Sequence, residues 1–357
     1  MPISRRNILI GAGATAALTT LPGCARTMRG RANADAEAQR LLTGIAEELL
    51  AEFPENATVL GLDKDARAGL KSRLSDRSLS GALKHASAAA DRLRRLHAVD
   101  AAALSPATRT DVAVLRAAHE LALEGHRFPY GDVVVLNQQC SYRNSPYVVA
   151  QNTGAFIEIP DFLDSNHAVV TAADAEAYLA RLEAYGGALD GETARLRRNA
   201  ELGVIAPSFL LDKTLKQMKE ARAVPVGKWG LVTSLARRTA PIPGDYAARV
   251  ERLVAQKVAP ALDRQIAELS RHRARATDAA GVWKLPQSDA YYAWALRAAT
   301  TSALTPYQVH QRGLDELNVL QARMDTLLRA QGLTKGTVGE RMTAIGKDPR
   351  HLFPNND

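Results

Sequence analysis

The chain has 357 residues, of which 46% are hydrophobic and 24% are charged. This composition is typical of a globular protein and excludes an intrinsically disordered chain. The formal net charge is +8, but the basic residues form short scattered clusters at 92–95, 195–199 and 271–275, none of them interleaved with aromatic residues. Such clusters predict solvated helix faces rather than a surface for nucleic acid or anionic lipid.

The first 23 residues have the pattern of an export signal. Arg5 and Arg6 form a twin-arginine start, and the apolar run Ile10 to Leu21 follows them. That run is too short for a membrane-spanning helix, which needs about 20 residues. We therefore predict a removable signal over residues 1–23, with export by the twin-arginine route to the periplasm or the cell envelope.

Residues 21–24, Leu-Pro-Gly-Cys, resemble the lipobox of bacterial lipoproteins, in which the cysteine carries a lipid. On this interpretation Cys24 is the lipidated N-terminus, and residues 24–40 are a tether to the membrane. Cys24 and Cys140 are the two cysteines of the chain, so a bridge between them is the competing interpretation.

Caps and apolar spacing predict helices through most of the remaining chain. We expect an all-α fold with one helical region at 41–222, a Pro/Gly linker at 223–244 and a second helical region at 245–357. An irregular segment at 128–170 interrupts the first region, with at most a short hairpin formed by the strand-like runs 133–136 and 156–159. The expected helices cover about 35–53, from Ser80, from Ser105, from Thr171 to the break at Gly186-Gly187, 190–202, 207–221, 245–273 with a kink at Pro260, from Ser288, from Thr305 and from Thr337.

Residues 285–328 are the least generic stretch. Ser288 can cap a first helix that weakens at the β-branched residues Thr300 and Thr301. Thr305 can cap a second helix, with Pro306 at its first position and a glutamine placed to close a capping box.

This stretch, LPQSDAYYAWALRAATT followed by LTPYQVHQRGLDEL, resembles the bacterial family called domain of unknown function 885. Further matches are FPENATVLGL, YLARLEAYGGALD, GVIAPSFLLDKTLKQM and GTVGERMTAIGKDPRHLFPN. The resemblance implies a mostly helical, exported, zincin-like metallopeptidase fold. It also implies zinc in an intact member, held by an H-E-x-x-P-G-H-H motif beyond the point where this sequence stops. We therefore expect residues 245–357 to be cut off in mid-domain, and the chain alone to bind no cofactor and to be inactive.

The residues themselves offer few catalytic candidates. A zincin site needs two histidines one helical turn apart, but His119-Glu120 is followed by Leu123 where the second histidine must stand, and His126 lies two turns away. We predict no metal site here and interpret His119 as part of a partly exposed helix end. Cys140 is expected to be a small buried hydrophobe.

Candidate substrate-binding residues lie in two places. Arg143 could pair with a substrate carboxylate, although a solvated loop is the simpler interpretation. The candidates in the stretch 285–328 could line a substrate channel, or could pack two helices together. The candidates are Tyr142, Arg143, Tyr291, Tyr292, Thr300, Thr301 and His310.

Two functional hypotheses remain open. In the first, the chain is the N-terminal helical portion of a peptidase-like protein, whose partners are the missing half or a peptide substrate. It predicts a large exposed apolar face on the helices from 245 to 330. In the second, the chain is a complete, non-catalytic lipoprotein that binds a peptide or a protein partner. Neither hypothesis involves nucleic acid, and neither fixes the oligomeric state.

Overall fold

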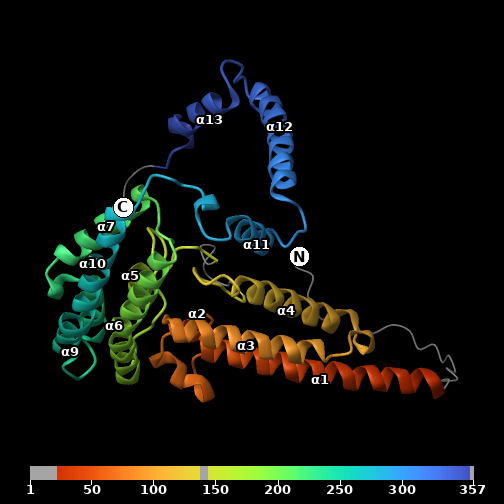
Figure 1. Ribbon diagram of the computed structural model, residues 1–357, viewed down its shortest axis with the longest axis horizontal. Coiled ribbons are helices and arrows are strands. Elements are labelled where there is room, and N and C mark those ends of the chain that lie inside the picture. Colours follow the sequence, from red (N-terminus) through yellow and green to blue (C-terminus); the bar gives the residue numbers. More distant parts are fainter. Residues whose placement is uncertain (1–21, 137–143, 354–357) are drawn as a thin grey trace, which may run out of the picture. The chain divides into compact units, whose positions relative to one another are not determined.

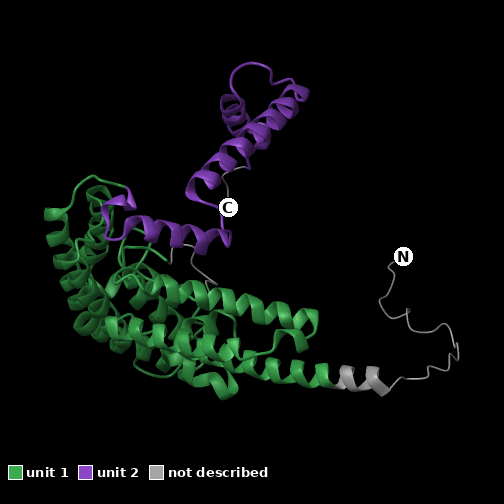
Figure 2. Cartoon of the chain, turned by 45° about the vertical axis from the view of Figure 1, so that its right-hand side comes forward, with its two compact units in different colours: residues 1–280 green, residues 281–357 purple. Residues whose placement is uncertain are grey.

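The computed structural model describes residues 22–136 and 144–353 (Figure 1), and describes side chains from residue 30 onward. These residues form helices and no strand, apart from one isolated bridge between Ala150 and Thr153. The all-α prediction is confirmed. The chain divides into two compact units, residues 1–280 and 281–357 (Figure 2).

Unit 1 contains ten α-helices among its described residues, with short 3-10 turns and one π-helical turn between them. They are α1 (Pro22–Glu52), α2 (Pro54–Val59), η1 (Asp65–Ser72), α3 (Leu79–His97), η2 (Ala101–Ala103), α4 (Pro106–Gly125), α5 (Ala155–Ser165), α6 (Ala172–Glu201), α7 (Ser208–Ala223), η3 (Val226–Lys228), α8 (Gly230–Thr239), α9 (Tyr246–Leu253), η4 (Val254–Val258) and α10 (Ala259–Arg275).

The central element of unit 1 is α6. Its start is the predicted one, because Thr171 and Asp174 form a reciprocal capping box. The predicted break at Gly186-Gly187 is wrong, since α6 continues through both glycines to Glu201. Gly186 has a packing role instead: a Cβ there would lie 3.0 Å from the carbonyl oxygen of Lys257, so its absence lets the π-helical turn approach closely.

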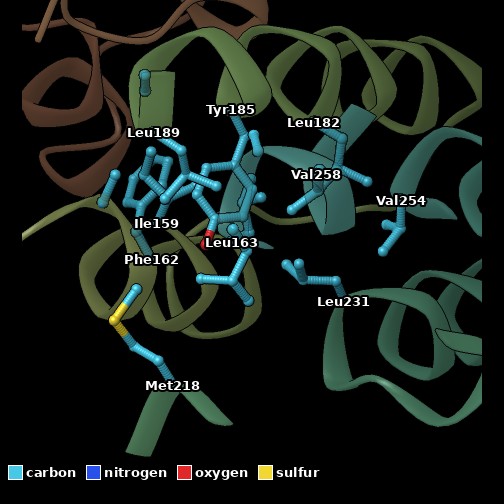
Figure 3. Packing of buried hydrophobic residues seen from close by; sticks show 14 of the residues in the cluster. Ile159, Phe162, Leu163, Leu182, Tyr185, Leu189, Met218, Leu231, Val254 and Val258 are labelled. Carbon is cyan, nitrogen blue, oxygen red and sulfur yellow. The ribbon is translucent and has the colours of Figure 1, made fainter. Parts of the chain in front are cut away.

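The main core is built on the buried face of α6 (Figure 3). Tyr185, Leu182 and Leu189 of α6 pack with Leu163 of α5 and Val258 of the π-helical turn. Val250 and Leu262, in the helix predicted over 245–273, are part of this core. The π-helical turn ends two residues before Pro260, where the kink was expected. The expected exposed apolar face is therefore not found on α9 and α10.

A second core cluster joins α1, α3 and α4 through Ile45, Leu96 and Val112. Ser105 caps α4 with Pro106 at its first position, as predicted, whereas α3 is capped by Ser78 and not by Ser80. Residues 24–40, expected to be a tether, are helical from Pro22 onward. Their alanine, arginine, glutamate and glutamine residues favour a helix.

Within the segment 128–170, the described residues before Ala155 form no helix and no strand, and α5 follows from Ala155 to Ser165. The run 156–159, which alternates like a strand, lies in α5, so the predicted strand is wrong. A short apolar run does not distinguish strand from helix, and here the left-handed Gly154 (φ 119°) turns the chain into the helix. The run 133–136 forms no strand; Val135 packs against Ala89 and Ala122.

Residues 223–244, expected to be a linker, contain η3 and the helix α8, whose Leu231 and Leu235 are buried in the main core. The two compact units instead divide between Ala280 and Gly281. Proline and glycine residues in this segment shape turns within unit 1 and do not separate domains.

Unit 2 contains η5 (Val282–Lys284), α11 (Ser288–Thr300), α12 (Pro306–Ala330), α13 (Val338–Lys347) and η6 (Pro349–His351). The predicted capping box of Thr305 with Gln308 is present, and α13 starts after Thr337 as predicted, with a capping box between Thr337 and Glu340. α11 starts after a left-handed Gln287, without the predicted side-chain cap from Ser288. No helix in the described part of the chain is long and apolar enough to cross a membrane.

Candidate functional site

Several residues singled out from the sequence lie outside the described residues. These are the twin-arginine pair Arg5 and Arg6, the candidate loop residues Tyr142 and Arg143, and Cys140. Cys24 lies in α1, ahead of the residues whose side chains are described.

The unit 2 candidates occupy different environments. Tyr291 is buried and meets Trp294 edge-on at 5.4 Å, as in the packing alternative, whereas Tyr292 and His310 are exposed. Thr300 donates a hydrogen bond from Oγ1 to the carbonyl of Leu296 (2.8 Å), and Thr301 follows as a left-handed residue that ends α11. The two threonines therefore terminate the helix, in keeping with their weak helical preference.

His119 is fully buried, which corrects the interpretation of a partly exposed helix end. Its Nδ1 lies 2.7 Å from the carbonyl oxygen of Leu115, and burial lowers its pKa. Within residues 22–136 and 144–353, no three His, Cys, Asp or Glu side chains are grouped so that they could hold a metal ion. These residues do not fit the zinc site that the family resemblance implies.

A buried ion cluster fixes the start of α5 against α6. Glu192 of α6 accepts hydrogen bonds from the backbone N–H of Ala155 (2.9 and 3.0 Å). Arg77 donates to Glu192 (3.1 Å) and to Glu158 (2.7 Å). Burial opposes the charge of Arg77, but the two carboxylates outweigh it and raise the pKa of the guanidinium. Removing one partner of a buried ion pair is strongly destabilising, because the other charge is left buried and unpaired. The cluster therefore holds the start of α5 firmly against α6.

The α5–α8 cleft lies where α5 and α8 are in contact, and has a volume of about 720 Å³. Its size falls within the usual range for ligand pockets. It is lined by Phe156, Pro160, Asp161, Asp164, Tyr185, Ala221, Val224, Lys228, Trp229, Gly230, Leu231, Thr233, Ser234, Arg237 and Leu262.

The apolar part of the α5–α8 cleft is held in place by backbone contacts. The indole N–H of Trp229 donates to the carbonyl of Val224 (2.8 Å), which ties the ring to the preceding turn. The Tyr185 hydroxyl lies 3.5 Å from the carbonyl oxygen of Phe156, and burial raises its pKa, so it stays protonated. These rings form a fixed apolar surface rather than a mobile one.

The α5–α8 cleft also carries charges of both signs. Asp164 accepts a hydrogen bond from the hydroxyl of Ser234 (2.5 Å). Asp161, Lys228 and Arg237 are exposed and make no ion pair with any residue that the structure describes. Charged groups of both signs around an apolar floor provide contacts for a ligand that has apolar side chains and charged groups of both signs.

No residue of this cleft was among the candidates predicted from the sequence. Asp161 and Asp164 fall within the segment predicted to be irregular, while Lys228 and Trp229 fall within the expected linker. The acidic pair at i and i+3 would have been a signal only if the helix α5 had been recognised, because that spacing places both residues on one helix face.

The fold and the cleft define a class of all-helical proteins with a surface cleft and, among the described residues, no metal site. The family model described as "Bacterial protein of unknown function (DUF885)" matches residues 54–357, and the chain belongs to this family. No curated protein matches the sequence.

A solved structure shares the fold. It is the crystal structure of the "putative lipoprotein from Colwellia psychrerythraea", with 22% sequence identity and a TM-score of 0.80. The match covers 90% of this chain and 56% of that one, so the chain spans about half the length of the solved relative.

Proposed function

We propose that this chain is an exported, lipid-anchored peptide-binding protein of the metallopeptidase-like family and that the α5–α8 cleft holds the peptide. The observation that carries this proposal is the cleft itself, with its apolar floor and unpaired charges. An extended peptide presents side chains and charges of both kinds within a few residues, so it matches such a lining better than a purely apolar ligand does.

Export and anchoring rest on the sequence and on the solved relative. The twin-arginine start and the lipobox-like residues before Cys24 support a signal that is removed and a lipid on Cys24. The relative of the same fold is itself called a lipoprotein. The lipid would keep the peptide-binding unit at the envelope membrane, where exported peptides are present.

Peptide hydrolysis is assigned to residues other than those described here. A zinc peptidase needs two histidines, a third ligand and an adjacent general base, and the described residues provide no such group. We therefore propose that this chain binds zinc weakly or not at all and does not cleave peptides by itself.

Titration calorimetry with a blocked tetrapeptide tests the binding claim. The probe contains Lys, Leu, Phe and Glu, and its control replaces both charged residues by Gln. We expect saturable binding of the charged peptide and about tenfold weaker binding by Arg237→Gln, since a hydrogen bond to a charged group contributes about 1.5–3 kcal/mol. Arg222→Gln is the matched control, because Arg222 is paired with Asp263 outside the α5–α8 cleft. Equal binding by both variants would refute the assignment.

The second half of the proposal needs a separate measurement. The purified chain is dialysed against zinc, its metal content is determined and it is incubated with the same peptides. Stoichiometric zinc together with chelator-sensitive cleavage would refute the non-catalytic assignment, and peptide binding without either result would support it.

A further inference from the structure

A second hollow in unit 1, the Arg77 pocket, lies between α3, the turn that follows α4, and α6, and has a volume of about 300 Å³. It does not share a residue with the α5–α8 cleft. It is lined by Phe53, Ser75, Asp76, Arg77, Leu79, Ala82, Leu83, His85, Ala86, His126, Arg127, Phe128, Pro129, Tyr130, Gly131, Asp132, Val133, Arg195, Arg198 and Asn199.

One polar side chain of this lining is almost fully buried and makes no hydrogen bond to any described residue. Asn199 is 5% exposed, and its side-chain amide has no partner within the described ranges. Buried polar groups are normally satisfied, because leaving one unpaired costs about 1–3 kcal/mol. The amide of Asn199 therefore points to a ligand in this hollow.

The chemistry of the lining indicates an acceptor. The amide of Asn199 can donate, and a guanidinium group can only donate. The rest of the Arg77 pocket favours negative charge, since its lining contains four arginines and two aspartates. One of the aspartates, Asp132, is already bound by Arg195 (2.6 Å), and Arg77 is balanced by Glu158 and Glu192. The arginines left for a ligand are Arg198, which is partly exposed, and Arg127, which is exposed, because neither pairs with a described carboxylate.

The remaining lining is apolar. Phe53, Leu79 and Leu83 face the hollow together with Phe128 and Val133. A free inorganic anion would leave this surface uncovered, whereas a carboxylate on an apolar body would cover it and reach the donors.

We propose that the Arg77 pocket binds a small organic carboxylate with an apolar body, held by Arg198 and Asn199. A volume of about 300 Å³ is near the lower end of the range for ligand pockets and fits a molecule of one ring or one amino-acid residue. Two sources share this chemistry: a free aryl or alkyl carboxylic acid, and the C-terminal residue of a peptide.

Titration calorimetry on the full purified chain tests the site with four probes. They are 3-phenylpropanoate, its neutral amide, the dipeptide Gly-Phe and Gly-Phe amide. We expect saturable binding of at least one carboxylate and at least tenfold weaker binding of its amide. Preference for 3-phenylpropanoate assigns the pocket to free acids, and preference for Gly-Phe assigns it to peptide C-termini; both support the proposal.

Two variants place the binding in the Arg77 pocket. Arg198→Gln and Asn199→Leu are each expected to weaken carboxylate binding by about tenfold or more. Arg197→Gln is the control, because it makes the same charge change at the neighbouring position, where the side chain pairs with Glu268 and does not line the pocket. Circular dichroism confirms that each variant is folded.

Three results would overturn the proposal. They are no saturable binding by any carboxylate, equal binding of a carboxylate and its amide, or unchanged binding by both Arg198→Gln and Asn199→Leu. Peptide binding in the α5–α8 cleft is tested separately with Arg237→Gln. A negative result for one proposed site is therefore distinguishable from a negative result for the other.

Discussion

The long helices α6 and α12 have the same kind of apolar pattern and opposite environments. α6 has 30 residues, of which fifteen are buried, including the charged residues Arg181 and Glu192. α12 has 25 residues, of which Leu328 alone is buried, while Leu317, Leu320 and other large apolar side chains remain exposed. An amphipathic pattern thus predicts a helix but does not tell whether its apolar face is covered within its own unit.

The charged side chains of α6 and α12 also lie in different environments. On α6 the buried guanidinium of Arg181 is enclosed: it donates to Nδ1 of His167 (2.7 Å), to the hydroxyl of Thr58 (2.7 Å) and to two backbone carbonyls. No carboxylate of a described residue pairs with it, and burial lowers its pKa to about 10. On α12 every charged side chain except Asp325 is exposed, and an exposed ion pair contributes at most about 1 kcal/mol. Asp325 is half-buried and pairs with the buried Arg341 of α13.

The largest expected effect comes from truncating the same residue type on each helix. Leu182→Ala on α6 removes a fully buried side chain and should lower the free energy of unfolding by about 2–5 kcal/mol. Leu317→Ala on α12, where the side chain is 48% exposed, should change it by less than about 0.5 kcal/mol. Urea denaturation followed by circular dichroism measures both. Equal losses would show that the face of α12 is covered in solution.

A pH effect should follow from His167, whose Nδ1 accepts from Arg181 and whose Nε2 lies 3.0 Å from the carbonyl oxygen of Asp174. Burial, with the neighbouring cations, lowers its pKa to about 4, so the folded state holds it neutral. The unfolded chain takes up a proton near pH 6.5. The stability that His167 contributes is complete above about pH 6.5 and is lost as the pH falls towards 4, by about 3 kcal/mol in total.

Urea denaturation at pH 7 and pH 4.5 measures this loss. His85, whose pKa burial also lowers to about 4, adds to the effect in the wild type. His167→Gln should therefore be less stable at pH 7 and show a smaller fall in stability between the two pH values. His310→Gln on the exposed surface of α12 should leave the fall unchanged. A His167→Gln variant with the wild-type pH dependence would contradict the account.

The smallest expected effect distinguishes two adjacent glycines of α6. Alanine in a helix is favoured over glycine by about 1 kcal/mol. At Gly187 no heavy atom meets an added Cβ, so Gly187→Ala should raise the free energy of unfolding by about 0.5–1 kcal/mol. Gly186→Ala should forfeit that gain, because its Cβ would meet the backbone of Lys257. Thermal unfolding of both variants gives the comparison, and equal gains would mean that the π-helical turn yields at little cost.

The features predicted correctly from the sequence are local ones. The helix starts at Thr171, Thr305 and Thr337 were predicted correctly, and each has a capping box that needs only residues three positions apart. The errors concern contacts between distant segments. Gly186 does not break α6 because Lys257 packs against it, and residues 156–159 are helical where Glu192 holds the start of α5.

The candidate sites depend on such distant contacts even more strongly. Trp229 and Asp161 are 68 positions apart in the sequence but line one cleft. His126 was considered only as a metal ligand with His119, and its actual neighbours in the Arg77 pocket come from α3 and α6. Spacing along the chain carries no signal for either arrangement.

Hydrogen exchange with and without the blocked Lys-Leu-Phe-Glu peptide tests the central claim most directly, because it locates bound peptide along the chain. The account predicts slower amide exchange in α5 and at the start of α8, with α11 and α12 unchanged. Slower exchange confined to α11 and α12 would contradict it and would instead favour the substrate-binding role first predicted for Tyr292 and His310.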